Sequence, residues 1–463
     1  MKSQRIALVI PGVVALLALV ALAVWLGGGH GLPLQLRVPG QDNAPAPGQA
    51  PTINLAGTFT QSHGVPAQLP GLWPGFRGPE MDGVSKETVP LARQWGADGP
   101  PVLWSVEMGE GYAGAAVRAG RVYVLDYDQQ ARDDVLRCLS LADGKEIWRR
   151  AYPVKVKRNH GMSRTVPAVS DKYVVSLGPK CHVICVDAVT GDYKWGLDLV
   201  RQYRTKVPPW YAGQCPIIDG NRAILAPGGS KMMIAVDCAT GKVLWETPNP
   251  EEWPMSHASI MPMTFNGKRM YVYTAVGGVV GVSADDGRVL WKTDQWQIKI
   301  ATIPTPIPLS DGRIFLTGGY NAGAMMLQLK AQGDSITAEP LFRLPAGQFG
   351  SGQQTPILYK DHIYGVIPDG RLACIDLNGN TLWTSGNTKR FGLGPYMIAD
   401  GMIYVMNDSG LLTLVEATPA GYRQLAEAKV LTGHDSWAPP ALAGGRLIVR
   451  DLTRMVCLDV RKK

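Results

Sequence analysis

The sequence predicts an all-β fold, an eight-bladed β-propeller of four-stranded antiparallel blades behind an N-terminal helix. Three observations lead to this prediction. A short phrase ending in tryptophan recurs at a steady interval, a proline-bearing strand opens most of the intervals, and an orphan strand upstream completes the last unit. The chain beyond the N-terminus consists of short Val, Ile, Tyr and Thr runs divided by 54 glycines and 35 prolines, which is typical of many short strands.

The repeated phrase is a small residue, a hydrophobe and an aspartate, followed by a turn and a final aromatic residue. It reads CVDAVTGDYKW in residues 185–195 and AVDCATGKVLW in residues 235–245. Further copies end at Trp148, Trp291 and Trp383, and two weaker copies end at Phe342 and Leu425. Six intervals cover the 277 residues from 148 to 425, about 46 residues each, which is the period of a propeller blade.

A second marker gives the number of blades. Each unit opens with a short strand, and these openings lie at Ala115, Pro167, Pro216, Pro262, Pro306, Pro356, Pro395 and Pro440. The eighth unit ends at Lys463 without a tryptophan-bearing strand, whereas PPVLWSV, with Trp104, stands alone upstream of the first unit. We therefore expect residues 101–107 to complete the last blade, because closing the ring removes an exposed strand edge.

Each part of the phrase has a physical role in this fold. The aspartates are expected to accept backbone N–H bonds in the turn that follows them, and Gly191 and Gly241 to supply its positive φ. The tryptophan is expected to wedge between neighbouring blades, with its indole N–H on a backbone carbonyl. The predicted docking residues are Trp104, Trp148, Trp195, Trp245, Trp291 and Trp383.

The N-terminus predicts a membrane anchor. Residues 6–26 carry no charge and follow Lys2 and Arg5, so residues 1–26 are interpreted as a signal-anchor helix in the inner (cytoplasmic) membrane with the propeller in the periplasm. Cleavage of a secretory signal after Ala23 is the alternative, and it would leave a free periplasmic protein. Residues 27–72 are rich in Pro, Gly, Ala and Gln and are predicted to be a flexible linker, which leaves 73–463 for the propeller.

Charge and cysteine usage argue against two classes of function. The net charge of +8 is spread along the chain, so no nucleic-acid partner is expected. Four cysteines occupy the same repeat position in different blades, namely Cys138, Cys185, Cys374 and Cys457. Equivalent positions in different blades are too far apart for a disulfide bond, so these residues are expected to be buried free thiols. The seven histidines show no zinc-like pairing, and adjacent acids such as Asp133–Asp134 are interpreted as solvated turns, so no metal site is predicted.

The phrase D-x-x-T-G-x-x-x-W resembles the tryptophan-docking motif of pyrroloquinoline-quinone (PQQ)-type propellers. Quinoprotein alcohol dehydrogenases share this motif with BamB, a lipoprotein of the outer-membrane β-barrel assembly machinery. The stretch WPGFRGPEMDGVSKET is still more similar to bacterial extracytoplasmic proteins with PQQ-binding-like β-propeller repeats. The resemblance covers residues 73–463 and implies the fold.

The resemblance implies two alternative functions. BamB-like proteins dock a partner on their faces, which favours a non-catalytic binding or scaffolding module of the cell envelope with no catalytic residue and no cofactor. No lipobox cysteine follows the apolar segment, so the tether would be the helix. The alternative is a PQQ-dependent alcohol dehydrogenase with PQQ and Ca²⁺, although the adjacent cysteine pair that many such enzymes place against the cofactor is missing here.

The binding site is predicted at one mouth of the central channel, where the segments that lead into the innermost strands meet. Aromatic, amide and basic side chains there suit an envelope protein, a peptide or a glycan. The candidates are His160, Arg164, Trp210, Tyr211, Gln214, His257, Gln353, Gln354 and Trp437. The alternative for each is that it merely fills the channel or satisfies loop backbone. The stretch LWPGFRGP, residues 72–79, is expected to pack beside the closing strand as a stabilising clasp.

Overall fold

The computed structural model describes residues 2–27, 52–298 and 300–462, and within the first range it describes side chains for residues 13–25. Residues 2–27 form helix α1 (Lys2–Gly27). In the part of the chain that is described, no helix combines the length and the apolar character that crossing a bilayer requires. Membrane insertion of residues 6–26 therefore stays a prediction, and the predicted linker lies outside the described residues over 28–51.

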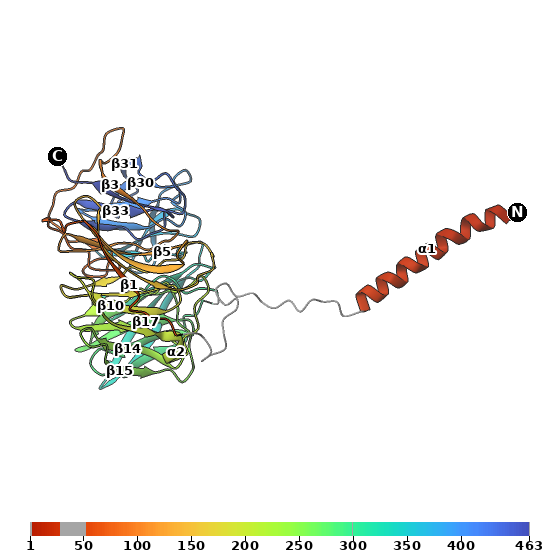
Figure 1. Cartoon of the computed structure of the whole chain (residues 1–463), viewed down its shortest axis with the longest axis horizontal. Coiled ribbons are helices and arrows are strands. Elements are labelled where there is room, and N and C mark those ends of the chain that lie inside the picture. Colours follow the sequence, from red (N-terminus) through yellow and green to blue (C-terminus); the bar gives the residue numbers. More distant parts are fainter. Residues whose placement is uncertain (1, 28–51, 299, 463) are drawn as a thin grey trace.

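Eight sheets follow one another along the described chain, and Figure 1 shows their strands from the side of the propeller. Each sheet has a core of four antiparallel strands, which pair in sequence order in the first seven, and two sheets gain a fifth strand from the segment before the propeller. Blades 1 to 4 consist of β4 (Ala116–Arg118), β5 (Arg121–Asp128), β6 (Asp133–Ser140) and β7 (Glu146–Pro153); β8 (Ala168–Val169), β9 (Tyr173–Leu177), β10 (His182–Asp187) and β11 (Tyr193–Asp198); β12 (Ile217–Asp219), β13 (Arg222–Leu225), β14 (Lys231–Asp237) and β15 (Val243–Pro248); and β16 (Met261–Phe265), β17 (Lys268–Ala275), β18 (Gly278–Ser283) and β19 (Val289–Thr293). A short helix, α2 (Leu199–Tyr203), joins blades 2 and 3.

The second half of the ring repeats this plan, and the last blade takes its outer strand from the N-terminal side of the propeller. Blades 5 to 8 consist of β20 (Ile307–Pro308), β21 (Arg313–Gly318), β22 (Gly323–Gln332) and β23 (Ser335–Leu344); β24 (Ile357–Tyr359), β25 (His362–Val366), β26 (Leu372–Asp376) and β27 (Thr381–Thr384); β28 (Tyr396–Ala399), β29 (Met402–Met406), β30 (Leu411–Glu416) and β31 (Gln424–Lys429); and β32 (Ala441–Ala443), β33 (Arg446–Arg450), β34 (Arg454–Asp459) and β3 (Val102–Glu107). Trp104 pairs opposite Cys457, so the predicted closing strand completes blade 8.

A β-bulge recurs in the outer strand of all eight blades, directly before the docking position. The bulged residues are Leu103, Ile147, Lys194, Leu244, Leu290, Leu341, Leu382 and Leu425. A bulge bends its strand and re-aims the next side chain, which here is the docking residue. In blade 7 that residue is Ala426, so the predicted weak copy at Leu425 is wrong by one position.

Docking works by contact between the tryptophan ring and the glycine turn of the next blade. A Cβ on Gly191 would lie 2.8 Å from Cδ2 of Trp148, and one on Gly241 would lie 2.6 Å from Cγ of Trp195. Both glycines have φ of +73°, as the turn requires. The predicted aspartate is confirmed as well, since Oδ1 of Asp187 accepts from two backbone N–H groups of the turn.

The small residue of the phrase lies opposite the tryptophan on the neighbouring strand. Cys138, Cys185 and Cys374 pair opposite Trp148, Trp195 and Trp383, respectively. In blade 4 the position is glycine, where a Cβ would meet the indole nitrogen of its own tryptophan at 2.1 Å. All seven cysteines are free and buried, which confirms the prediction made for the four at the shared repeat position.

Four of the six indoles donate to a carbonyl of the next blade, among them Trp104 to Leu141 at 3.0 Å and Trp195 to Cys238 at 2.9 Å. The expectation is wrong for Trp245 and Trp291. Among the described residues Nε1 of Trp245 has no partner, and the carbonyl of Ala284 that corresponds to Cys238 accepts from Arg222 instead.

Trp291 donates to Sδ of Met270 in its own blade. The next blade explains this difference, because β22 and β23 run on to a tight hairpin at residues 332–335 in place of the D-x-x-T-G turn. No turn carbonyl of the usual kind is therefore presented to this indole.

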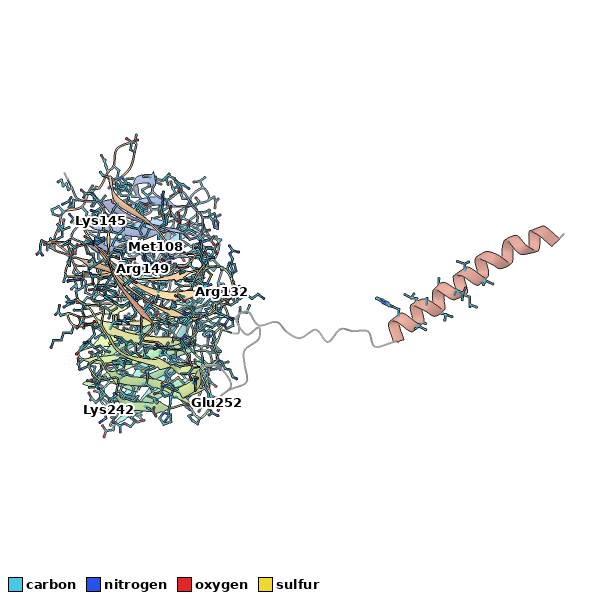
Figure 2. All side chains as sticks on the ribbon, viewed as in Figure 1. Met108, Arg132, Lys145, Arg149, Lys242 and Glu252 are labelled. Carbon is cyan, nitrogen blue, oxygen red and sulfur yellow. The ribbon has the colours of Figure 1, made fainter. Side chains whose placement is uncertain are left out.

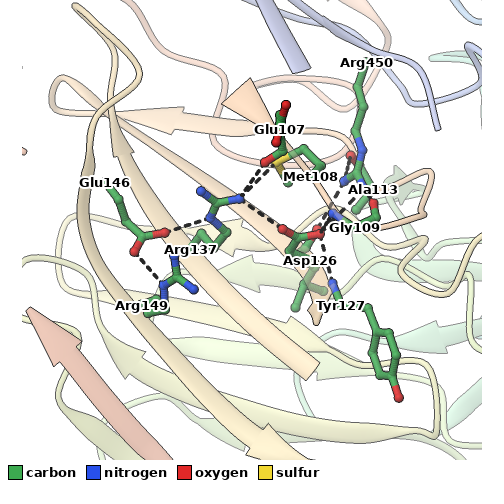
Figure 3. Close-up of polar contacts among 11 residues, drawn as sticks. Glu107, Met108, Gly109, Ala113, Asp126, Tyr127, Arg137, Glu146, Arg149 and Arg450 are labelled. Carbon is green, nitrogen blue, oxygen red and sulfur yellow. Dashed lines mark hydrogen bonds and ion pairs between the residues drawn. The ribbon is translucent and has the colours of Figure 1, made fainter. Parts of the chain in front are cut away.

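The seam between blades 8 and 1 is tied by buried charges (Figure 3). Arg450 of β33 donates to the carbonyl of Gly109 at 2.8 Å, and the N–H of Gly109 donates to Asp126 of β5 at 2.8 Å. Arg137 bridges Asp126 at 3.0 Å and Glu146 at 2.8 Å. Charge-assisted bonds of this kind hold the two ends of the propeller together.

Residues 52–72, which belong to the predicted linker, differ from that prediction. β1 (Thr58–Gln61) adds a fifth strand to the outer edge of blade 1, and the N–H of Ala67 donates to the carbonyl of Gly120 at 3.0 Å. Leu55 is buried between blades. These strand and side-chain contacts hold a segment whose composition alone resembles a tether.

Asp134 also departs from its interpretation as a solvated turn residue. It is buried at the start of β6 and accepts a short hydrogen bond from Tyr152. Burial raises the pKa of Asp134 to about 7, partly offset by the bond from Tyr152. In the folded protein the protonated carboxyl is thus favoured below about pH 7.

We expect the change Trp195→Phe to destabilise the propeller more than Trp245→Phe. Both changes shorten a packed ring, but only the first removes an indole donor from a carbonyl, that of Cys238. The weak thiol donor of Cys185 alone then remains on that carbonyl, and the expected cost is about 1 kcal/mol. Thermal and urea unfolding of the two variants measure the difference. Equal destabilisation would show that the indole hydrogen bond contributes nothing.

We expect the contribution of Asp134 to the stability of the protein to fall as the pH rises from about 4 to about 7, because folded Asp134 must lose its proton in a buried site that the unfolded chain lacks. Asp134→Asn removes this contribution. The variant's melting temperature relative to wild type should therefore increase across this window, with a free-energy difference above about 1.4 kcal/mol, the equivalent of one pKa unit. A difference that is independent of pH would contradict the shift.

Candidate functional site

One side of the ring is crossed by the segment 72–85, which we call the floor segment. Trp73 bridges Val117 of blade 1, and the carbonyl of Pro74 accepts from Val169 of blade 2 at 2.7 Å. Farther along, β2 (Val84–Ser85) runs parallel to β28, the inner strand of blade 7. The floor segment therefore crosses between inner strands on opposite sides of the ring, and its expected position beside the closing strand is wrong.

Arg77 anchors the floor segment. Its guanidinium donates to the carbonyls of Thr355 at 2.7 Å and Pro356 at 3.0 Å in blade 6, and to those of Met81 and Asp82 in the floor segment itself. Burial lowers the pKa of Arg77 to about 10, which leaves it charged at neutral pH. The sequence predicted that the stretch containing Arg77 packs on the propeller, but it did not show the hydrogen-bond partners of Arg77.

A chain of hydrogen bonds links five successive blades where their inner strands begin. The N–H of Val166 donates to Sγ of Cys215, that of Cys215 to Oγ of Ser259, that of Ser259 to Oγ1 of Thr305, and that of Thr305 to Oγ1 of Thr355, with lengths of 2.9–3.2 Å. At Cys215, Ser259 and Thr305 the donor's own side chain accepts from the previous blade. This chain fixes the loops that precede the inner strands.

Those loops form the face opposite the floor segment, which we call the rim face. Figure 2 shows Arg132 and Glu252 on this face and Lys145 and Lys242, in the turns of the docking phrase, on the other. The alternation of strand direction within each blade produces this separation, since the loops between blades and the docking turns lie at opposite strand ends.

The rim face joins side chains from four blades around Tyr112. The guanidinium of Arg164 lies 5.0 Å from the Tyr112 ring centre, and the ring of Trp437 lies 5.1 Å from it. The Tyr112 hydroxyl donates to Asp435 at 3.1 Å, and Gln354 donates to the carbonyl of Trp437 at 3.1 Å. The structure thus brings together three of the predicted rim residues, all half-buried.

His257 reaches the same cluster from blade 4. Burial and, to a smaller extent, the charge of Arg164 lower the pKa of His257 to about 4. The imidazole is therefore neutral at physiological pH. Burial also lowers the pKa of Arg164 to about 10, so its guanidinium keeps the positive charge of the pair.

Three predicted residues lie in strained backbone. His160, Trp210 and Tyr211 have φ of +57°, +61° and +73°, a region that residues with a Cβ rarely adopt. His160 is exposed and Trp210 is half-buried, whereas Tyr211 is fully buried and donates to the carbonyl of Lys157. The ammonium of Lys180 lies 5.0 Å from the Tyr211 ring centre.

The two remaining candidates differ from each other. Gln214 is fully buried and makes two hydrogen bonds with the backbone of Ala226. It therefore satisfies loop backbone, the alternative role given above for each candidate. Gln353 is half-buried. Sequence reasoning missed Tyr112 and Asp435. Both lie in loops that lead into inner strands, so the position that selected the other residues could have found them.

The floor side contains a cleft of about 670 Å³ between blades 6 and 7, lined by Asp82, Lys86, Glu87, Tyr359, Lys360 and Asp400, among others. Its acids hold the chain that precedes the closing strand. Glu87 accepts from the N–H groups of Leu72 and Gly444, and Asp400 accepts from the N–H of Leu91. These contacts indicate a structural role for the cleft.

The rim face offers a poor donor set for PQQ with calcium. Calcium requires several oxygen ligands on one ion, and in the described ranges no three His, Cys, Asp or Glu side chains converge on a common point. Asp435 accepts from Tyr112, and Asp408 accepts from the Trp437 indole at 2.7 Å. Each acid therefore has a structural partner already.

Comparison with known proteins places the chain in a family. A family model described as outer membrane protein assembly factor BamB matches residues 131–378, more than half of the 463 residues. The chain belongs to the BamB family. No curated protein sequence matches this BamB-family propeller.

Solved structures agree on the fold. The crystal structure of BamB from Moraxella catarrhalis is 12% identical with a TM-score of 0.52, covering 78% of this chain and 99% of that one. The computationally designed Ika8 protein gives 13% identity and a TM-score of 0.52, covering 78% of this chain and 100% of its own. A quinohemoprotein alcohol dehydrogenase from Pseudomonas putida HK5 is 12% identical with a TM-score of 0.47, covering 86% and 81%. At these identities the likeness shows the propeller fold alone.

We expect Arg77→Leu to loosen the floor segment of this BamB-family propeller, because four backbone carbonyls lose their donor. Hydrogen exchange of residues 72–90 should accelerate by about tenfold or more, the equivalent of roughly 1.4 kcal/mol in local opening. Lys86→Ala, at a side chain that is 62% exposed, is the matched control and should leave exchange unchanged. Unchanged exchange in the Arg77 variant would show that the anchor lies elsewhere.

Proposed function

We propose that this chain is a non-catalytic binding and scaffolding module of the cell envelope, with residues 6–26 in the inner membrane and the propeller in the periplasm. The observation that carries the proposal is the rim cluster, in which half-buried Arg164, Gln354 and Trp437 from three blades are held around Tyr112. Aromatic and arginine side chains in a fixed, partly exposed arrangement are typical of protein-binding surfaces.

The division between the two faces supports the same proposal. The middle of the floor side is crossed by the floor segment, which Arg77 and β2 hold in place. The rim face keeps strained, partly exposed side chains such as His160 and Trp210. Membership of the BamB family, whose name describes an assembly factor, agrees with a role in binding a protein partner.

The proposal is tested by placing a photo-crosslinking amino acid at His160 on the rim face and, as the matched control, at Lys242 on the opposite face of the full-length chain in its native membranes. Both positions are exposed. We expect discrete adducts with an envelope protein from position 160 and few or none from position 242. Equal yields from the two positions would contradict docking through the rim.

The dehydrogenase alternative is tested on the same purified chain. Added PQQ and Ca²⁺ should leave the melting temperature unchanged and produce no dye-linked alcohol oxidation. A ligand present at 100 times its Kd would stabilise the protein by about 2.7 kcal/mol, which thermal unfolding readily detects. Turnover together with such a shift would overturn the scaffold proposal.

A further inference from the structure

The rim face is unevenly charged. The loops of blades 2 and 3 carry seven cationic side chains, namely Lys155, Lys157, Arg158, Arg164, Lys180, Arg204 and Lys206. No acid occurs in residues 155–164 or 199–215. Among the described residues, Glu110 pairs with Arg158 at 2.6 Å and Glu252 with Arg204 at 3.1 Å, both from neighbouring loops. Asp435 of blade 8 borders the basic group, because it accepts from the Tyr112 on which Arg164 stacks, and Asp408 of blade 7 lies beyond it on Trp437.

Arg164 stands out in this group because its charge is poorly compensated. It donates to the carbonyl of Asn159 at 3.2 Å and stacks on Tyr112, and no carboxylate pairs with it among the residues that the structure describes. Its Nε is buried without a hydrogen-bond partner in the same set. A cation withdrawn from water in this way gains most from an anion that completes its hydrogen bonds.

The surroundings of Arg164 suit a carboxylate brought from outside. His257 is neutral, as its lowered pKa shows, so it does not add a second charge next to the guanidinium. The exposed cations at Lys155, Lys157 and Lys206 extend the positive surface well beyond what a single small anion would cover.

We propose that the rim face of blades 2 and 3 binds an acidic peptide segment of a partner protein, with one carboxylate of that segment paired to Arg164. The extended run of lysines favours a segment with several acidic residues, because each exposed pair adds only a small amount of affinity. Asp435, next to Tyr112, and Asp408 beyond it repel the same segment and mark the border of the basic surface. This inference rests on the proposed function and specifies the chemistry of its partner.

The test is fluorescence anisotropy of the purified full-length chain with a fluorescein-labelled peptide of alternating glutamate and glycine. The same peptide with glutamine in place of glutamate is the control probe. We expect binding of the acidic peptide alone, which weakens as salt is raised. Arg164→Gln should weaken binding by about tenfold or more and Arg164→Lys by less, since lysine keeps the charge but loses the planar donor set.

Matched variants distinguish a specific role of Arg164 in peptide binding from a general effect of net charge or of misfolding. Lys157→Gln on the rim should weaken binding by about threefold, as for an exposed pair, and Lys242→Gln on the opposite face should leave it unchanged. Melting temperatures of all variants confirm folding, and the exposed variant Lys157→Glu tests the same surface if Arg164→Gln does not fold.

Several outcomes would overturn the inference. These are equal binding of the glutamine peptide, an unchanged affinity in Arg164→Gln, or displacement of the peptide by vesicles of phosphatidylglycerol but not by those of phosphatidylcholine, which would assign the basic surface to a membrane. Cross-links from position 160 that persist without acidic-peptide binding would reject this inference and leave the docking function intact. Peptide binding without cross-links would reject the docking function and retain the carboxylate site.

Discussion

The whole ring depends on one contact, the flat indole of one blade against the glycine turn of the next. The contact works only if three other positions cooperate. The turn must lack a Cβ at Gly191 or its equivalent, the residue opposite the indole must be small, and a bulge must turn the outer strand before the docking position. Because these positions lie in two neighbouring blades, each blade is completed only by its neighbour.

Deviations from the pattern occur where a neighbour lacks the expected turn. Blade 7 carries Ala426 at the docking position, and the blade that follows it is built from the two ends of the propeller, β34 and β3, without a connecting turn. Trp291 faces a blade with a longer hairpin and donates to a sulfur of its own blade instead. The seam where the ring closes has both kinds of contact. Trp104 docks on the Gly144 turn of blade 1, and the buried charges of Arg450, Arg137 and Asp126 add further bonds.

The two faces of the ring are used differently. In the floor segment, Arg77 donates its hydrogen bonds to backbone carbonyls of the protein itself. These bonds stabilise the start of an inner strand. On the rim face Arg164 keeps part of its capacity unused, beside a neutral histidine and an aromatic pair. A structural arginine thus has its N–H donors bonded within the chain, whereas an arginine suited to a ligand has N–H donors that the chain leaves without acceptors.

The sequence by itself determined the all-β class, the eight units, the closing strand with Trp104 and the burial of the cysteines, because these follow from a local phrase repeated at a fixed period. Tertiary structure alone decided that residues 52–72 pack on the propeller, that Asp134 is buried and that the floor segment crosses the ring. It also brought Tyr112, Arg164 and Trp437, which are far apart in the sequence, into contact. Such contacts join blades distant along the chain, and a local pattern contains no information on which side chains will meet when the ring closes.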